Sequence, residues 1–338
     1  MNARADTIAP AGVRAKADAT PNNYISFSIR HQVIEFNAFR EGWNKIAQVH
    51  HRGTHAQIAG GLLLLGQSGA GKTTLIEYYR DTFPIEHLPD QTIVRVLVVQ
   101  TPAMPTVKNL AEAILHALGD KDINKGSTEE KTRRIFKLLV GCRVELLIID
   151  EFQHFYDSRR RSVANQVADW LKGVLNVARI PVVVVGLQRA ETVIRLNEQL
   201  ARRFSSGFDL RPFDYHTKEG KLEFRGLLKT IRSCIPVQCI DFHEGNLALK
   251  FFVATNGLID YIAKIIDEAV QIAARQITPF IDLSTLAQAF EESVWRSVPE
   301  KLNPFNPDAE LRPLNKVGEP FERWNAIIMP VREPEEGR

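Results

Sequence analysis

The chain has 338 residues, of which 44% are hydrophobic and 25% are charged, and its formal net charge is +3. These values are typical of a globular protein with one large domain and a smaller companion. A membrane protein is not expected, because no apolar run approaches the ~20 residues that a transmembrane helix needs. The mildly basic charge permits a local nucleic-acid-binding surface but does not require one.

Two features bear on cellular location. Residues 1–24 have no hydrophobic periodicity and no apolar core of a signal peptide, so they are predicted to form a mobile leader. The three cysteines, Cys142, Cys234 and Cys239, are odd in number and lack the spacing of a metal site. Reduced thiols in a cytoplasmic protein are the simplest interpretation.

An amphipathic helix is the first predicted element, because apolar residues recur at helical spacing from Ile29 to His51. Three histidines, His50, His51 and His55, cluster near its end. A metal site would need further ligands, and nothing nearby in the sequence supplies them. We therefore interpret the cluster as a solvated helix terminus.

The segment up to residue 214 alternates apolar strands with helices. Five strands are predicted, at residues 62–65, 92–100, 144–151, 180–186 and 207–213. Helices are predicted between them, one beginning at Thr74 and others over residues 107–118, 131–140, 161–178 and 190–202. Strands that are apolar throughout and separated by helices are typical of a parallel sheet covered on both faces. Residues 25–214 are therefore predicted to form an α/β core.

The pattern changes at residue 215. Helices alone are predicted over residues 218–232, 244–255, 257–275 and 283–296, which indicates a small α-helical domain at 215–298. Residues 299–338 are rich in proline and are predicted to be an extended tail with exposed aromatic side chains, Phe305, Phe321 and Trp324. The tail could lie on a partner's surface or fold back on the helical domain, and both remain open.

A phosphate-binding loop follows the first predicted strand. Residues 66–73 read GQSGAGKT and match the pattern G-x-x-x-x-G-K-[ST] between a strand and a helix. In this pattern the backbone N–H groups surround phosphates, Lys72 reaches the β and γ phosphates, and Thr73 binds Mg²⁺. The predicted nucleotide-binding residues are Gly66, Gln67, Ser68, Gly69, Ala70, Gly71, Lys72, Thr73 and Thr74. A glycine-rich turn before a helix is the structural alternative.

Two carboxylates, Asp150 and Glu151, end the third predicted strand. Together with a phosphate loop they predict hydrolysis of a nucleotide: Asp150 would hold Mg²⁺ and Glu151 would polarise the attacking water. A second acid at this place favours an ATPase over a GTP switch.

Arg202 and Arg203 lie just before the last predicted strand, beside Phe204. They could be a solvated helix end. With the phosphate loop and the paired acids, however, the position suits an arginine finger that reaches the γ-phosphate of a neighbouring subunit. Arg203 is our first choice and Arg202 the second.

The order of these segments resembles that of AAA+ ATPases. The run Asp-Glu-Phe-Gln-His at residues 150–154, and the helix beginning Ile29-Arg30-His31, resemble the TniB/TnsC group of transposition regulators. The resemblance covers roughly residues 25–296. It implies a five-stranded parallel sheet sandwiched by helices, a C-terminal α-helical lid, and ATP and Mg²⁺ as cofactors. It also implies self-assembly on double-stranded DNA without sequence preference, marking of the insertion target, and recruitment of a transposase. Members in CRISPR-associated transposons work through a TniQ-type targeting protein.

Two positions depart from the AAA+ pattern. Where relatives often carry a polar sensor, this chain has Gly186-Leu187-Gln188, so only Gln188 could serve. In the predicted lid, Asp260 stands where many relatives carry arginine. An acid cannot pair with a γ-phosphate. Slow turnover, with ATP acting mainly as an assembly signal, is therefore expected.

The resemblance also places DNA contacts in loops after the second strand and around the following helices. The candidates are Lys108, Lys121, Lys125, Arg133 and Arg134, with Arg159, Arg160 and Arg161 after the paired acids. Such contacts to the DNA backbone would be independent of sequence and sensitive to salt. For each single charge, a solvated surface residue is the favoured alternative, because most Lys and Arg side chains are exposed in any case.

Two alternative functions remain. A replication-initiator or helicase-loader ATPase is disfavoured by the Gln153-His154 pair and by the lack of an appended helix-turn-helix domain. A nucleotide-gated signalling or scaffold protein would bind nucleotide without DNA and form no oligomer on it. A small-molecule kinase fits poorly, because the C-terminal helical domain is large.

Overall fold

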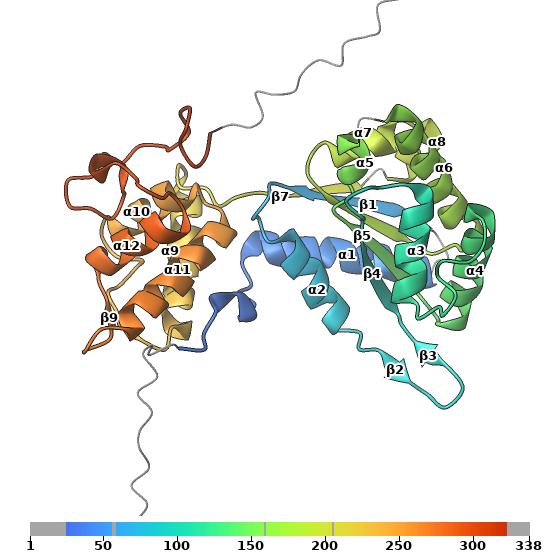
Figure 1. Cartoon of the computed structure of the whole chain (residues 1–338), viewed down its shortest axis with the longest axis horizontal. Coiled ribbons are helices and arrows are strands. Elements are labelled where there is room, and N and C mark those ends of the chain that lie inside the picture. The colour runs from blue at the N-terminus through green and yellow to red at the C-terminus, as the bar shows by residue number, and fades with distance from the viewer. Residues whose placement is uncertain (1–24, 56–58, 159, 205, 323–338) are drawn as a thin grey trace, which may run out of the picture.

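A computed structural model describes residues 25–55, 59–158, 160–204 and 206–322. Figure 1 shows an α/β core and a separate helical domain, connected along one side by the N-terminal segment and helix α1. A five-stranded sheet in the order β4-β5-β6-β1-β7 forms the centre of the core, and every pairing in it is parallel. Its strands are β1 (Gly61–Gly66), β4 (Val96–Gln100), β5 (Leu146–Asp150), β6 (Val182–Gly186) and β7 (Ser206–Leu210).

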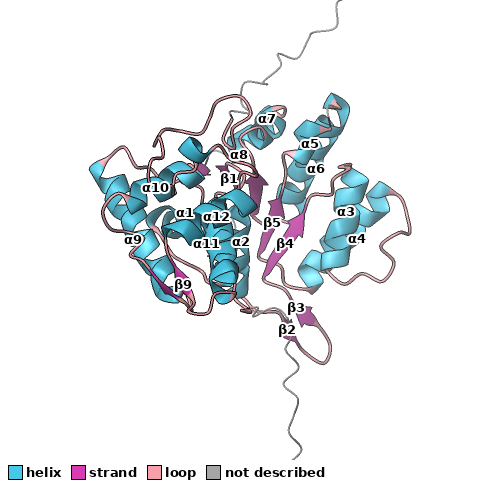
Figure 2. Cartoon of the chain, turned by 60° about the vertical axis from the view of Figure 1, so that its left-hand side comes forward, coloured by secondary structure: helices cyan, strands magenta, loops and turns pink. Residues whose placement is uncertain are grey.

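Helices cover both faces of this sheet, with α1 and α2 on one side and α3 and α4 on the other (Figure 2). Alternate residues of β1 explain the two layers: Leu62 and Leu64 join one hydrophobic cluster, and Leu63 and Leu65 join the other. The predicted fold class is confirmed. The core helices are α1 (Asn37–His55), α2 (Lys72–Asp81), α3 (Val107–Ala117), α4 (Thr128–Gly141), α5 (His154–Asp157), α6 (Arg161–Val177), α7 (Ala190–Arg195) and α8 (Glu198–Arg203).

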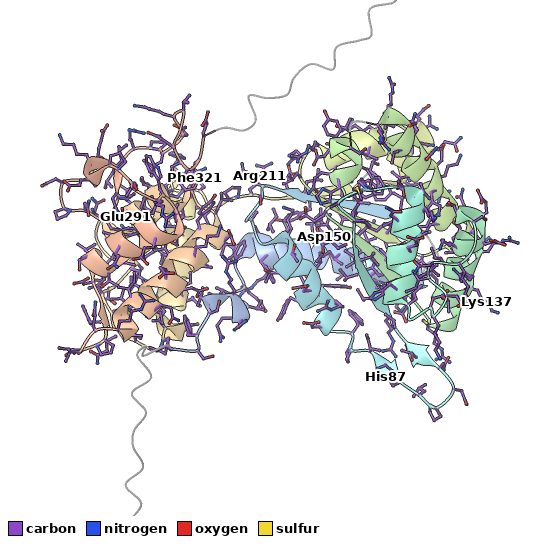
Figure 3. The ribbon with its side chains drawn as sticks, in the orientation of Figure 1. His87, Lys137, Asp150, Arg211, Glu291 and Phe321 are labelled. Carbon is purple, nitrogen blue, oxygen red and sulfur yellow. The ribbon has the colours of Figure 1, made fainter. Side chains whose placement is uncertain are left out.

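Three predicted elements are divided in the structure. The first helix is a short 3-10 turn, η1 (Ile29–His31), followed by extended residues and then α1. The helix predicted over 190–202 breaks because the Asn197 side chain caps α8 by accepting a hydrogen bond from the Leu200 N–H, at 3.0 Å. The strand predicted over 92–100 contributes β3 (Thr92–Ile93) to a hairpin with β2 (Glu86–His87), which projects from the core near the labelled His87 (Figure 3).

The helical domain, called the lid below, consists of four helices and a two-stranded parallel pair. Its apolar side chains continue the hydrophobic cluster that covers the α1–α2 face of the sheet. No helix in the described ranges is long and apolar enough to cross a bilayer. The lid elements are α9 (Lys218–Cys234), β8 (Gln238–Cys239), α10 (Leu247–Thr255), α11 (Ile259–Ala274), β9 (Phe280–Ile281) and α12 (Leu283–Ser293).

The described part of the tail, up to residue 322, folds back on the lid. Phe305 is fully buried, with its ring 5.0 Å from that of Phe251, so the expectation that it is exposed is wrong. The Lys250 ammonium donates to the backbone carbonyls of Pro304 and Asn306, at 2.6 and 2.8 Å. A proline-rich segment can bury aromatic rings without regular hydrogen bonding. In the described part of the tail, the regular structure is the 3-10 turn η2 (Glu300–Leu302).

Phe321 is partly buried against the lid, with its ring 5.1 Å from that of Tyr261 on α11. Trp324, the third aromatic residue predicted to be exposed, lies outside the described residues.

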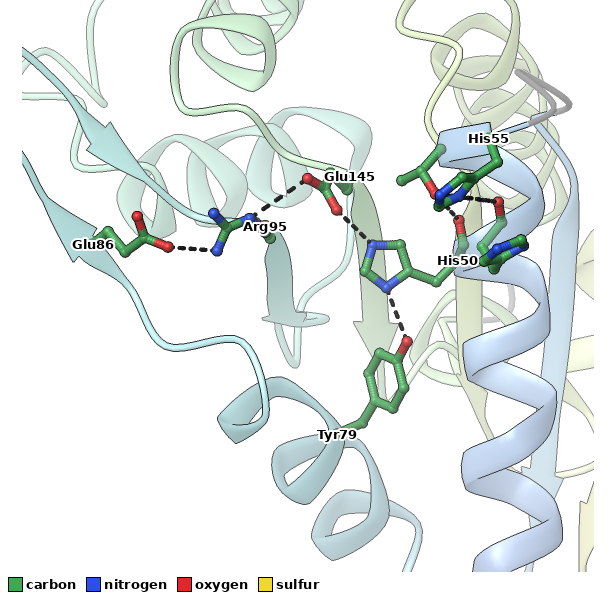
Figure 4. Close-up of polar contacts among 8 residues, drawn as sticks. His50, His55, Tyr79, Glu86, Arg95 and Glu145 are labelled. Carbon is green, nitrogen blue, oxygen red and sulfur yellow. Dashed lines mark hydrogen bonds and ion pairs between the residues drawn. The ribbon is translucent and has the colours of Figure 1, made fainter.

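The histidine cluster at the end of α1 is only partly solvated. His51 and His55 are exposed and stacked, but His50 is buried between α1, α2 and β5 (Figure 4). The His50 Nε2 atom lies 3.1 Å from the Glu145 carboxylate, and Nδ1 lies 2.9 Å from the Tyr79 hydroxyl. Because an ionised carboxylate only accepts, Nε2–H donates to Glu145 and Nδ1 accepts from Tyr79. The prediction of a solvated terminus is therefore wrong for His50.

Candidate nucleotide site

The phosphate-loop residues connect β1 to α2 at the carboxyl edge of the sheet, beside the labelled Asp150 (Figure 3). Gly71 caps α2 with a φ of 95°, a left-handed conformation that favours glycine. The first N–H groups of a helix have no partner within the helix, and its dipole favours an anion at this end. The loop and the start of α2 therefore offer N–H groups and a favourable dipole to an anion.

Lys72 reaches back across this loop. Its side chain is 6% exposed, and its ammonium donates to the backbone carbonyls of Gly66 and Gln67, at 3.0 and 2.9 Å. Burial lowers the pKa of Lys72, while the nearby carboxylates of Glu151 and Asp150 oppose that shift. A buried ammonium held by neutral carbonyls gains from an arriving phosphate, because the phosphate supplies the charge that the carbonyls lack.

Thr73 and Asp150 meet across the end of the sheet. The Thr73 hydroxyl donates to Asp150 Oδ2 at 2.8 Å, and the Glu151 N–H donates to Asp150 Oδ1, also at 2.8 Å. Burial raises the pKa of Asp150, and these two hydrogen bonds oppose the rise. A hydroxyl and a carboxylate are hard oxygen donors of the kind that Mg²⁺ prefers, so the residues present fit that ion.

Glu151 follows β5 in a left-handed conformation, with a φ of 55°. This conformation costs a residue other than glycine about 1–3 kcal/mol and is concentrated at functional sites. Glu151 belongs to the set of side chains that line the cavity described below. The carboxylates predicted from the sequence are thus brought together with the phosphate loop.

Gln153 connects Glu151 to the end of β6. Its side chain is 3% exposed; its amide nitrogen donates to the Glu151 carboxylate, and its amide oxygen accepts from the Leu187 N–H at 3.1 Å. A Cβ at Gly186 would lie 2.5 Å from that same amide oxygen, so glycine is needed there. The sequence patterns connect Gln153 with the family resemblance and the contrast with replication initiators, and assign it no role at the site. Its role in positioning Glu151 was missed, because the signal is a buried contact and not a motif.

A cavity of about 370 Å³ opens beside the phosphate loop and extends between the N-terminal segment and the lid. One part is polar, with the loop, Glu151 and Gln153. The other part is apolar, with side chains from the N-terminal segment, α1, α9 and α11. A volume of this size with an apolar part and a few polar groups suits a small ligand that has a flat ring and a charged end. The apolar lining residues from these segments are Ile29, Ile34, Phe36, Phe39, Ile231, Ile259 and Ala263.

Asp260, at the start of α11, closes the lid side of the cavity. Its N–H donates to the Gly69 carbonyl at 3.1 Å, which attaches the lid to the phosphate loop. Its carboxylate contacts Arg30 at 2.6 Å and Lys264 at 2.9 Å. Burial opposes ionisation of Asp260, but hydrogen bonds from Lys264 and Arg30 outweigh it and lower the pKa of Asp260. Asp260, which stands where many relatives carry arginine, therefore pairs with an arginine of the N-terminal segment.

The remaining predicted catalytic residues lie elsewhere. Gln188 is exposed, and its amide donates to Asp209 at 2.9 Å, so it does not line the cavity. Arg202 is exposed and pairs with Glu198 on α8. Arg203 donates to the Asn176 side chain at 2.6 Å. Neither arginine lines the nucleotide cavity of its own chain.

The predicted DNA-contact residues divide into two groups. Exposed side chains are found at Lys108, Lys121, Arg133, Arg160 and Arg161, and Arg159 lies outside the described residues. Lys125 is exposed but pairs with Asp122 at 2.8 Å.

Arg134 differs from this exposed group because it donates to the carbonyls of Asp122 and Lys125. Arg134 and the buried Lys131, which donates to the Ile123 carbonyl, instead stabilise the loop before α4.

Comparisons with solved structures show the same fold. The Aeropyrum pernix ORC2 protein, solved as ADPNP-ADP complexes, matches with a TM-score of 0.60 and 16% identity over 78% of this chain and 70% of that chain. The ORC1 protein of Aeropyrum pernix, solved in complex with DNA, matches with a TM-score of 0.57 and 15% identity over 77% and 66%. Cdc6p from Pyrobaculum aerophilum matches with a TM-score of 0.57 and 15% identity over 83% and 72%.

Comparisons of the sequence with curated proteins and with family models gave different results. No curated protein matched the chain. The family model for the bacterial TniB protein matches residues 25–214, the segment that carries the sheet, the phosphate loop and the paired acids. The resemblance recognised from the sequence is thereby confirmed. The chain has the AAA+ ATPase fold and belongs to the family of bacterial TniB proteins.

Proposed function

We propose that this protein is an ATP- and Mg²⁺-dependent regulator of DNA transposition that assembles on double-stranded DNA, marks the target site and recruits a transposase. The observation that carries the nucleotide part is that Lys72, Thr73 and Glu151 line one cavity at the edge of the sheet, with Asp150 bonded to Thr73. Membership of the TniB family supports the transposition part.

The residues of this chain have separate roles in the proposed ATPase reaction. Backbone N–H groups of the loop and the Lys72 ammonium bind the phosphates and compensate their charge. Thr73 and Asp150 would hold Mg²⁺, which supplies charge neutralisation at the phosphates. Glu151 orients the attacking water and accepts its proton, and Gln153 fixes the Glu151 carboxylate by a hydrogen bond.

Assembly completes the proposed site. Arg203, with Arg202 as the second choice, would act on the nucleotide of a neighbouring subunit, since both lie away from the cavity of their own chain. A cation supplied between subunits makes hydrolysis depend on oligomer formation. The exposed Lys108, Lys121 and Arg133 would contact the DNA backbone. A transposase and a TniQ-type targeting protein are the proposed partners.

DNA binding is tested by fluorescence anisotropy of a labelled duplex with a non-hydrolysable ATP analogue, with ADP, and without nucleotide. The proposal expects tight binding with the analogue only, and weakening as salt rises. Combined substitution of Lys108, Lys121 and Arg133 by alanine should weaken binding to duplexes of any sequence. Nucleotide binding without any DNA binding would favour the signalling or scaffold alternative.

The arginine finger is tested by mixing two inactive variants. Arg203→Ala keeps its own Glu151 but lacks the finger, and Glu151→Gln keeps the finger but lacks the base. Mixed oligomers should recover part of the DNA-stimulated ATPase activity, because a finger from one variant can serve the intact site of the other. No recovery at any ratio would contradict action between subunits. Parallel mixing with Arg202→Ala decides between the two arginines.

A replication initiator or helicase loader is the second candidate, because the solved structures with the same fold include ORC and Cdc6 proteins. Those matches are 15–16% identical, so they concern the fold alone. Direct capture of a replicative helicase by this protein, without capture of a transposase, would favour this candidate.

A further inference from the structure

The N-terminal segment brings an arginine to the nucleotide cavity. Arg30, in the 3-10 turn before α1, lines the cavity together with the phosphate loop. Its Nη1 atom lies 2.6 Å from Asp260 Oδ1, and its Nη2 atom donates to the Asp260 carbonyl at 3.3 Å. Asp260 in turn contacts Gly69 of the loop. The guanidinium therefore sits at the junction of three segments that are far apart in the sequence.

This position is fixed by contacts other than the Arg30 side chain itself. The Ser28 hydroxyl and the Ile29 N–H both donate to the Asp267 carboxylate on α11, each at 2.7 Å. Farther along the helix, the Gln271 amide donates to the Ile25 carbonyl at 2.8 Å. The segment thus lies along α11, between the lid and α2 in Figure 1. An arginine held by its backbone in this way needs little reorganisation to act on a ligand.

A bound nucleoside triphosphate would need a second cation in the cavity besides Lys72. Among the described residues that line it, Lys72 and Arg30 are positive, and Glu151 and Asp260 are negative. A nucleoside triphosphate with its metal ion still adds net negative charge, and Lys72 alone cannot compensate it. Arg30 is the remaining cation that lines the same space, and guanidinium groups bind phosphate by paired hydrogen bonds.

Asp260 can release Arg30 without becoming an unpaired charge. Lys264, one turn further along α11, contacts the other oxygen of its carboxylate at 2.9 Å. Arg30 Nε also lies 3.8 Å from the Asp267 carboxylate, so Arg30 remains attached to α11 when its Nη atoms leave Asp260 for an arriving phosphate. Asp260 also packs on Gly69, in the half of the loop whose carbonyls hold Lys72, the residue expected at the outer phosphates.

We propose that Arg30 binds the terminal phosphate of ATP and that Asp260 is the residue that positions it. The lid acid thus recruits a cation from the N-terminal segment instead of supplying one itself. Because Arg30 belongs to a segment attached to α11, the presence of a third phosphate is communicated to the lid. This inference rests on the proposed function, namely that the cavity binds ATP.

The test compares the dissociation constants of ADP and a non-hydrolysable ATP analogue in the full-length protein. Arg30→Ala should weaken binding of the ATP analogue by about 10-fold or more, and that of ADP by less than about 3-fold. Arg30→Asp alone should lose the preference for the triphosphate. The double variant Arg30→Asp/Asp260→Arg should recover most of it, because the pair is restored with the cation on the lid.

Two controls separate this role from others. Ser28→Ala loosens the same segment but keeps the guanidinium, so it should change ATP and ADP affinities by equal factors. Lys72→Ala should abolish binding of both; if it does not, the nucleotide site itself is wrong. If Lys72→Ala abolishes binding but Arg30→Ala weakens ADP and ATP equally, or the double variant stays as poor as Arg30→Asp, the role of Arg30 is overturned.

Discussion

The two ends of strand β5 carry similar acids in different surroundings. Glu145 precedes the strand and is closed into a network with His50 and Arg95, in which every charge has a protein partner (Figure 4). Asp150 ends the strand beside Thr73, and Lys72 is held nearby only by backbone carbonyls. At the first end, the charged and polar groups all find their partners within the protein. The second end has contacts that a phosphate and a metal ion can replace.

This difference separates stability from function along a single strand. A charge whose partners are all internal contributes to folding, and its loss leaves buried groups unpaired. A charge held by weak, exchangeable partners contributes to ligand binding, and its loss affects the fold little. Substitutions at the two ends should therefore have opposite effects on unfolding and on nucleotide affinity.

Lys72→Ala should produce the largest effect on binding. Removal of the ammonium should weaken ATP affinity by at least about 100-fold, because the outer phosphates lose a charged hydrogen bond. The melting temperature should not fall, since the burial that lowers the pKa of Lys72 is itself unfavourable. Calorimetric titration and thermal unfolding measure the two quantities. Lys137→Ala, an exposed lysine on α4, is the control, and equal affinities in the two variants would remove Lys72 from the site.

Glu151→Gln should keep nucleotide binding and lower the rate of hydrolysis by about 100-fold, because an amide cannot accept the proton of the attacking water. The measurement is phosphate release under saturating ATP and DNA. Glu291→Gln, on the exposed face of α12, should leave the rate unchanged. Normal turnover in Glu151→Gln would show that another group acts as the base.

His50→Leu should lower the free energy of unfolding by about 1–3 kcal/mol, because Glu145 and Tyr79 each lose a hydrogen-bond partner. Its ATP affinity should equal that of the wild type. Denaturant unfolding followed by circular dichroism measures the first quantity. His51→Leu, the exposed neighbour, is the control. A loss of ATP affinity without a loss of stability would contradict the separation of the two ends.

His50 should also make the stability of the fold depend on pH. Burial lowers the pKa of His50, and its hydrogen bond to Glu145 opposes the shift. The unfolded chain then binds the proton more readily than the folded chain, so stability is full above the unfolded pKa of about 6.5 and falls as the pH drops below it. His50→Leu should reduce this slope relative to the wild type. An unchanged slope would assign the acid sensitivity to other groups.

Gln153→Ala should produce the smallest of these effects. The Glu151 carboxylate loses the amide that fixes it, so turnover should fall by about 10-fold while the KM for ATP stays the same. Gln166→Ala, an exposed glutamine on α6, should change neither. A rise in KM with unchanged turnover would instead place Gln153 in nucleotide binding.

The sequence predicted the features that are local in the chain. The phosphate loop, the paired acids and the order of apolar strands each depend on neighbouring residues, so their patterns are visible without a structure. The parallel sheet followed from the alternation of strands and helices. The division of the helix over 190–202 was missed, because one capping side chain, Asn197, determines it.

The features that escaped prediction depend on contacts between distant segments. Arg30 meets Asp260 only because the N-terminal segment lies along α11. His50 is buried because α2 and the start of β5 provide Tyr79 and Glu145. Phe305 is buried because the lid offers an aromatic surface to a segment without regular structure. The spacing of residues in a single sequence does not show which distant segments will contact each other.

The central claim is that nucleotide bound beside Asp150, at the carboxyl end of β5, controls assembly on DNA. The most direct test is negative-stain imaging of the purified protein with and without duplex DNA, and with and without a non-hydrolysable ATP analogue. Rings or helical filaments are expected only when both are present, and none for Lys72→Ala. Monomers under every condition, in a protein that still binds the analogue, would contradict it.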